Sequence, residues 1–149
     1  MLVDLQPSLF LPPEAPSSEH FAWHELAFLW NANDLPAVHD WLNGRWSALV
    51  RNRIGGQADP EAQFLQALAF AALALHFTQS RNQSGAALML DDALVALTRF
   101  RPSYLGVRID PILDTLKELQ PLLFGLAHNA ECPRQPFAYN KLELEPKQP

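Results

Sequence analysis

The most apolar stretch of the chain covers residues 64–77. Its apolar positions fall on every face of a helix and not along one stripe, which is typical of a helix buried on all sides. Asp59 can cap this helix, because its carboxylate accepts hydrogen bonds from the first amides, and Pro60 suits the first helical position. The pattern therefore predicts a buried central helix over residues 59–80. The apolar stretch is shorter than the roughly 20 residues that cross a bilayer, so we expect no membrane span.

Hydrophobic residues at helical spacing predict four further helices. Each begins with a residue that can cap a helix, and two of them also have an early proline. The predicted ranges and starts are 17–31 with Ser17 or Ser18, 34–53 with Asp34 and Pro36, 84–100 with Ser84, and 110–120 with Asp110 and Pro111. A short further turn of helix is expected at 122–126. No segment shows the alternation of a strand, so the sequence predicts an all-α fold, an antiparallel bundle of about five helices.

The two ends of the chain differ from this helical middle. Residues 1–16 contain four prolines, which fix φ and remove backbone donors, and they predict an extended N-terminal arm. Residues 17–130 form the predicted helical bundle domain. Residues 131–149 again contain four prolines and few large apolar residues, and they predict an irregular, loosely attached tail. The start of the chain lacks the basic residues of a signal peptide, so we expect a cytoplasmic protein.

Charge and cysteine content narrow the possible functions. The net charge of −5 argues against a nucleic-acid-binding protein, which would present a basic face. The single cysteine, Cys132, allows no internal disulfide and fits a reducing compartment. Seven arginines lie in the middle of the chain, where folding either gathers several of them into an anion site or leaves them scattered over solvated helix faces. They are Arg45, Arg51, Arg53, Arg81, Arg99, Arg101 and Arg108.

Residues 30–46 begin with an aromatic–asparagine pair and continue with His, Asp, Leu and Trp at a fixed spacing. This segment resembles the signature of domain of unknown function family 309. Trp30 stands for the family's Phe, and Asn33 stands for its Gly, which fits a left-handed turn position. The residues that keep the family's identities are Asn31, His39, Asp40, Leu42 and Trp46.

Two later segments are similar to the same family. Residues 64–86 resemble its Phe-Leu-Gln-Gly start, apolar run and Asn-X-X-Gly-Ala end, and residues 102–107 resemble its Pro-X-Tyr-X-Gly-Ile loop. Asn43, Ala67 and Arg108 depart from the family pattern, which has Glu, Gly and Asp there. The resemblance implies a small, helical, cytoplasmic protein without an established activity. The resemblance therefore supports the predicted helical bundle but does not imply any particular reaction.

His39 is the leading candidate for a functional side chain. On a helix it shares one face with Asn43 and Trp46. The family's Glu at the place of Asn43 would allow metal binding or an acid–base pair, but an amide cannot ionise. Asp40 does not replace that Glu, since neighbouring helical residues point about 100° apart. Three interpretations stay open: a core histidine bonded to another helix, which is the commonest case, a ligand pocket, and a metal or catalytic site.

Gln66 and His76 are the strongly polar residues of the apolar stretch. They lie roughly 15 Å apart along a helix axis, so they cannot both hold one metal. We expect Gln66 to be buried and to need a partner, either on another helix or on a ligand, because an unbonded buried amide is costly. The candidate pocket consists of His39, Asp40, Trp46, Gln66 and His76.

Other chemistry-bearing residues give weaker signals. His20 and His24 have a spacing that permits metal binding, but no third ligand is evident. Cys132 has no basic neighbour that would activate it as a nucleophile. The chain also lacks a glycine-rich phosphate loop, a cysteine pair and a nucleophile elbow. The sequence thus predicts no metal and no cofactor, and it argues against an enzyme.

Two hypotheses for function remain. The first is a non-catalytic helical module that binds a protein partner or self-associates, suggested by large residues in segments expected to be flexible: Phe10, Trp23, Phe137 and Tyr139. The second is a small-molecule pocket between the second and central helices, lined by His39, Trp46 and Gln66. In an enzyme of this kind His39 would act as the general acid or base. Neither hypothesis involves nucleic acid or a membrane.

Overall fold

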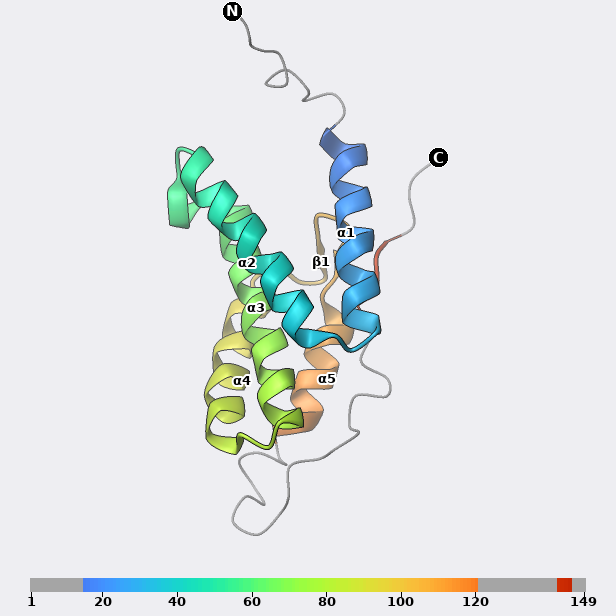
Figure 1. Cartoon of the computed structure of the whole chain (residues 1–149), viewed down its shortest axis with the longest axis vertical. Helices are drawn as coiled ribbons and strands as arrows, with labels where there is room; N and C mark the ends of the chain where they lie inside the picture. The colour runs from blue at the N-terminus through green and yellow to red at the C-terminus, as the bar shows by residue number, and fades with distance from the viewer. Residues whose placement is uncertain (1–14, 121–141, 146–149) are drawn as a thin grey trace, which may run out of the picture.

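A computed structural model describes residues 15–120 and 142–145 of the chain. The order of its elements, shown in Figure 1, is α1 (Ala15–Asn31), α2 (Leu35–Asn52), the 3-10 turn η3 (Gly56–Ala58), α3 (Pro60–Gln79), α4 (Gln83–Thr98), β1 (Ser103–Tyr104), β2 (Val107–Arg108) and α5 (Asp110–Gln120). The predicted all-α bundle is confirmed. None of the described helices is long and apolar enough to cross a membrane.

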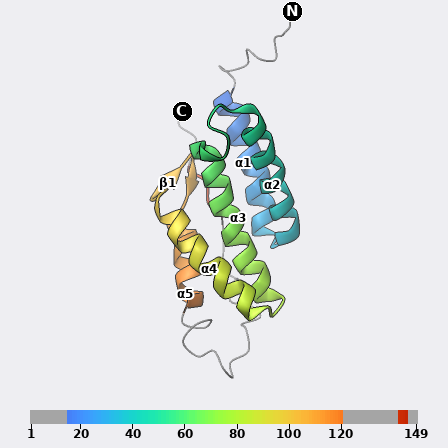
Figure 2. The same ribbon diagram turned by 90° about the vertical axis from the view of Figure 1, so that its left-hand side faces the viewer.

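α3 is the central helix of the bundle. It packs most extensively against α4 and next against α2. Figure 2 shows α3 with α1 and α2 on one side and with α4 and α5 on the other. α3 contributes a large share of the buried core, with Phe64, Leu65, Leu68 and Leu75 almost fully buried. The prediction that this segment organises the fold is therefore confirmed.

The prediction that α3 is buried on every side is wrong for one stripe of the helix. Gln66 is exposed, and Ala69, Phe70, Leu73 and Phe77 are only partly buried. These positions follow the spacing of a single helical face. Neighbouring helices cover the rest of α3 and leave this face open, so the even spread of apolar residues does not reveal which side meets solvent.

Polar side chains fix the starts of three helices. Asp34 caps α2 by accepting from the Ala37 amide, and Asp59 caps α3 by accepting from the Ala62 amide, both as predicted. The predicted cap of α4, Ser84, is wrong: the cap is Asn82, whose Oδ1 accepts from the Gly85 amide at 3.0 Å. The helix starts at Gln83, so Ser84 already lies within its first turn.

The prediction of no strands is wrong at the loop before α5. β1 and β2 pair antiparallel, with Tyr104 opposite Val107. Leu105 and Gly106 between them have φ values of 52° and 83°, the two positive angles of a tight hairpin turn. Strands of two residues are too short to show a period of two, which is why the sequence pattern misses them.

Residues 142–145 lie against this hairpin. Val107 forms a bridge with Leu144, and the Arg108 and Glu145 amides donate to the Glu143 and Gly106 carbonyls at 2.8 and 2.7 Å. Leu142 is buried in the core. The description of a loosely attached tail therefore does not fit these four residues. The predicted extended arm over 1–16 is wrong at its end, because Ala15 and Pro16 already belong to α1. Residues 1–14, the turn at 122–126 and the rest of the tail lie outside the described residues.

Candidate functional site

A groove runs between α2 and α3, along the open stripe of α3. One hollow in it, of about 200 Å³, has His39, Asn43 and Trp46 on the α2 side. Gln66 and Phe70 belong to the α3 side of the same hollow. We call this the α2–α3 groove. The lining of this first hollow is mostly apolar, and its polar side chains are His39, Asn43, Gln66 and the indole of Trp46.

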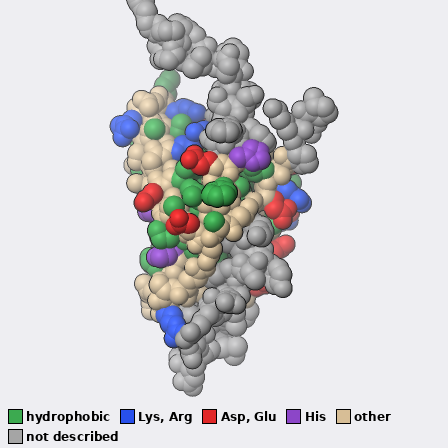
Figure 3. Space-filling view, turned by 45° about the vertical axis from the view of Figure 1, so that its right-hand side comes forward, with side chains coloured by type: hydrophobic (Ala, Val, Ile, Leu, Met, Phe, Trp, Pro, Cys, Tyr) green, Lys and Arg blue, Asp and Glu red, His purple; other side chains and the backbone are tan. Residues whose placement is uncertain are grey.

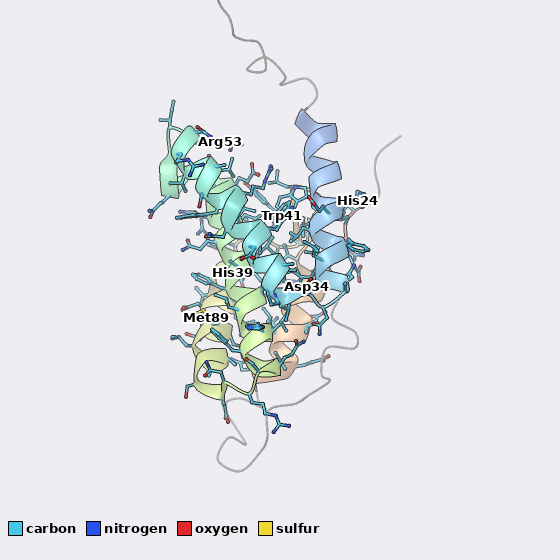
Figure 4. The ribbon with its side chains drawn as sticks, in the orientation of Figure 1. His24, Asp34, His39, Trp41, Arg53 and Met89 are labelled. Atoms are coloured by element: carbon cyan, nitrogen blue, oxygen red, sulfur yellow. The ribbon has the colours of Figure 1, made fainter. Side chains whose placement is uncertain are left out.

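A second hollow, of about 230 Å³, adjoins the first. It is bounded by Pro36 and Asp40 from α2 and by His76 from α3. His39 and Leu73 line both hollows. In Figure 4 the labelled His39 lies where α2 passes in front of α3. The two hollows therefore form one elongated depression, with His39 at its middle.

The structure brings the five predicted pocket residues to this depression in two groups that share His39. Trp46 and Gln66 line the first hollow, and Asp40 and His76 line the second. The expectation that Gln66 is buried and needs a partner is wrong, since its side chain is exposed to solvent. It lies on the face of α3 that no helix covers, so water can satisfy its amide.

His39 is partly buried, and its ring forms no hydrogen bond with any residue in the described part of the chain. The core interpretation, in which a neighbouring helix binds the imidazole, therefore lacks its expected partner there. His39 instead lines both hollows. Sequence reasoning missed the groove residues Phe70 and Leu73. Gln66 could have indicated them, because a polar residue marks the solvent-exposed face of a helix and Phe70 and Leu73 lie on the same face of α3.

The groove does not bring together the groups of a catalytic or metal site. Among the side chains that the structure describes, no three of His, Cys, Asp or Glu are placed to hold a metal ion. His24 is exposed on α1, while the side chains of His20 and Cys132 lie outside the described residues. The arrangement can enclose apolar groups and can offer hydrogen bonds at its edges.

The first turn of α3 carries a second polar cluster, in which two predicted arginines bind acids of the same chain. Glu61 is only 6% exposed. Its Oε2 accepts two hydrogen bonds from Arg45, at 3.1 and 2.8 Å. Its Oε1 accepts from Arg53 at 3.1 Å, and Arg53 also donates to Asp59. A buried carboxylate is thus matched by two guanidinium groups.

The ionisation of this cluster reflects its contacts. Burial alone would raise the pKa of Asp59, but hydrogen bonds from the Ala62 amide and from Arg53 hold that pKa below its usual value. Burial would lower the pKa of Arg53, and its bonds and attraction to Asp59 and Glu61 raise it instead. Burial and the nearby charges of Glu61 and Asp59 raise the pKa of the Tyr104 hydroxyl.

The seven arginines do not form one open anion site in the described residues. Arg101 pairs with Asp110, Arg108 pairs with Glu143, and Arg99 donates to Gln63 and lies over the Phe100 ring. Each of these contacts places the guanidinium beside a group of its own chain. Five of the seven arginines therefore contact groups of their own chain, and the two that come together, Arg45 and Arg53, share Glu61.

Trp23 was expected in a flexible segment and is instead a core residue. It is 1% exposed, and its ring packs 5.5 Å from that of Trp41 and 5.8 Å from that of Phe64. The expectation is wrong because Trp23 falls on the inner face of α1. Phe10, Phe137 and Tyr139 lie outside the described residues.

Several residues that carry the family resemblance have structural contacts. Asn33 has a φ of 62°, as expected for a position where the family has Gly. Asn31 binds both backbone groups of Leu142. Asn82 caps α4, and Gly106 forms the hairpin turn. These residues therefore form turns, a cap and a tertiary contact.

No family model, no curated protein and no solved structure matches the chain. The resemblance to family 309 stays a prediction that rests on the sequence motifs.

Proposed function

We propose that the chain is a non-catalytic helical module of the cytoplasm that binds a protein partner, with an apolar segment of that partner seated in the α2–α3 groove. The observation that carries the proposal is the open, elongated depression between two antiparallel helices. Trp46 and Phe70 stand in its wall, and aromatic side chains of this kind supply much of the affinity at protein interfaces.

The size and shape of the groove favour a peptide. Pockets for small molecules usually measure about 300–1,000 Å³ and enclose most of the ligand. Each hollow here is smaller, at about 200 and 230 Å³, and both open to solvent. An amphipathic helix lays successive apolar residues along such a groove, so two adjoining hollows suit two of its side chains.

A small-molecule ligand is the second candidate function. It is favoured by one observation: His39 and Gln66 approach the same hollow from opposite helices. A small ligand with one polar group at each end would use both side chains. Both candidate functions use the α2–α3 groove, and they differ in the size of the molecule that binds there.

The test uses a pair of glutamine-to-lysine variants. Gln66 lines the groove and Gln120 ends α5, and both side chains are exposed, so the two variants should fold alike. Helical peptides are selected from a library against the purified chain, and their affinities are measured for each variant. We expect Gln66→Lys to weaken binding about tenfold, because a charge would be buried under the peptide, and Gln120→Lys to leave it unchanged.

Two outcomes would contradict the proposal. One is selection of peptides whose affinity is the same for Gln66→Lys and for the unaltered chain. The other is the absence of selected peptides together with binding of a compound from a small-molecule library, which would favour the second candidate. Light scattering over a range of concentrations shows whether the chain self-associates, and repeating it with Gln66→Lys shows whether the groove is involved.

A further inference from the structure

A different surface lies where α1 meets α2, and it shares only Asp40 with the lining of the groove. Phe28 of α1 projects into solvent with 73% of its surface exposed, and Trp41 of α2 is only partly buried. Figure 3, which turns the right-hand side of Figure 1 forward, shows hydrophobic side chains near the centre of the view, with Asp and Glu side chains beside them and Lys or Arg side chains at their upper edge. We call this surface the acidic α1–α2 face; it consists of Glu25, Phe28, Asp34, Asp40 and Trp41.

The charge of this part of the chain has one sign. The first 44 residues contain six Asp and Glu residues and no Lys or Arg. Glu25, Asp34 and Asp40 are exposed. The first cation along the chain, Arg45, is bound to Glu61 at the start of α3. Exposed acids on one surface attract positively charged partners over a distance of about 10 Å.

Trp41 is held in place on this face. Its indole Nε1 donates to Glu25 Oε1 at 3.0 Å, which ties α2 to α1. Its ring also packs on the buried ring of Trp23. A tryptophan that is already ordered loses little conformational entropy when a partner covers it, and such residues are frequent centres of binding energy.

We propose that the acidic α1–α2 face docks a basic amphipathic helix of a partner protein. Apolar side chains of the partner cover Phe28 and Trp41, and its Lys and Arg side chains reach Glu25, Asp34 and Asp40. Charge selects this occupant, because a second copy of the same face would place like charges opposite one another. The face shares Asp40 with the second hollow of the α2–α3 groove, but the inference rests on Phe28, Trp41 and the acids beside them and not on occupation of that groove.

The probe is a fluorescent helical peptide of about 18 residues with leucine on one face and lysine on the other. Its counterpart carries glutamate in place of lysine. We expect the full chain to bind the lysine peptide, with an affinity that falls as salt is added, and not the glutamate peptide. Phe28→Ser should weaken binding about tenfold, as expected for loss of a partly covered phenylalanine.

The acids are tested together by Glu25→Gln, Asp34→Asn and Asp40→Asn in one chain. These changes remove charge but keep an acceptor for Trp41 and a cap for α2. We expect this triple variant to weaken binding about tenfold and to flatten its dependence on salt. Two controls match these changes on α4 and α5: Leu88→Ser, and the triple variant Asp91→Asn, Asp114→Asn and Glu118→Gln, all at exposed positions.

Three results would overturn the proposal. The first is equal binding of the lysine and glutamate peptides. The second is a loss of binding in the α4–α5 controls as large as that in the variants of the acidic α1–α2 face. The third is loss of binding on Gln66→Lys, which would place the peptide in the α2–α3 groove. Circular dichroism of each variant confirms that the helices are retained.

Discussion

The carboxylate of Glu61 is bound by Arg45 of α2 and also by Arg53, the residue that caps the end of α2, and Arg45 supplies its shortest contact. Arg45 donates to Glu61 Oε2 through both Nε and Nη2, at 3.1 and 2.8 Å. The same guanidinium lies 5.7 Å from the centre of the Trp23 ring. One side chain of α2 thus reaches both the first turn of α3 and the core face of α1, so this contact couples three helices.

Replacing Arg45 with Met should lower the free energy of unfolding by about 2 kcal/mol. Removing one partner of a buried ion pair leaves a poorly compensated charge, and the partial exposure of Arg45 reduces that cost below the value for fully buried pairs. The double variant Arg45→Met, Glu61→Met should recover part of the loss, because both charges are then absent. Urea unfolding gives all three values.

The matched control for this prediction is Arg101→Met. Arg101 and Asp110 also form a close pair, but both side chains are largely exposed. Exposed pairs contribute little, so we expect almost no change in stability. Equal losses for Arg45→Met and Arg101→Met would show that burial of Glu61 does not matter.

Asp59 should make the fold less stable in acid. Its pKa is lower in the folded chain than the ordinary value of 3.8. The unfolded chain therefore binds a proton more readily, so the stabilisation is present above the ordinary pKa and is lost as the pH falls through the folded pKa. We expect the free energy of unfolding, measured in urea from about pH 6 to about pH 2, to decrease below about pH 4.

Asp59→Asn isolates this contribution. Asparagine still caps a helix, so the start of α3 is preserved, but it does not titrate. The free energy of unfolding of this variant should decrease less in acid than that of the unaltered chain. The contribution of Asp110 should remain, because its hydrogen bond with Arg101 lowers the pKa of Asp110. An unchanged pH profile would mean that Asp59 has the same pKa in both states.

His39→Leu separates a structural role of the imidazole from a binding role. The His39 ring has no hydrogen-bond partner in the described part of the chain, so leucine should leave the free energy of unfolding unchanged or raise it slightly. Binding of peptides selected for the α2–α3 groove should change. A loss of about 1–3 kcal/mol in stability would instead show that a buried partner holds the ring.

The sequence predicted those features that depend on neighbours along the chain. The helices, the caps Asp34 and Asp59, and the left-handed turn at Asn33 are each set by a few consecutive residues. The apolar run of α3 also predicted its central place, because a helix that is apolar on all sides has to be covered. All five candidate pocket residues were predicted from the sequence, and all five lie on α2 or α3, the two helices that border the groove.

Only the tertiary structure decided which face of α3 stays open, and hence that Gln66 is exposed and Glu61 is buried. A sequence shows how apolar a helix is, but the positions of its neighbours determine which side they cover. The contact of Asn31 with Leu142 joins residues that are 111 positions apart, and the two-residue strands near it have no pattern of their own. Such contacts form because the folded chain brings distant groups within bonding distance, and local sequence does not encode that distance.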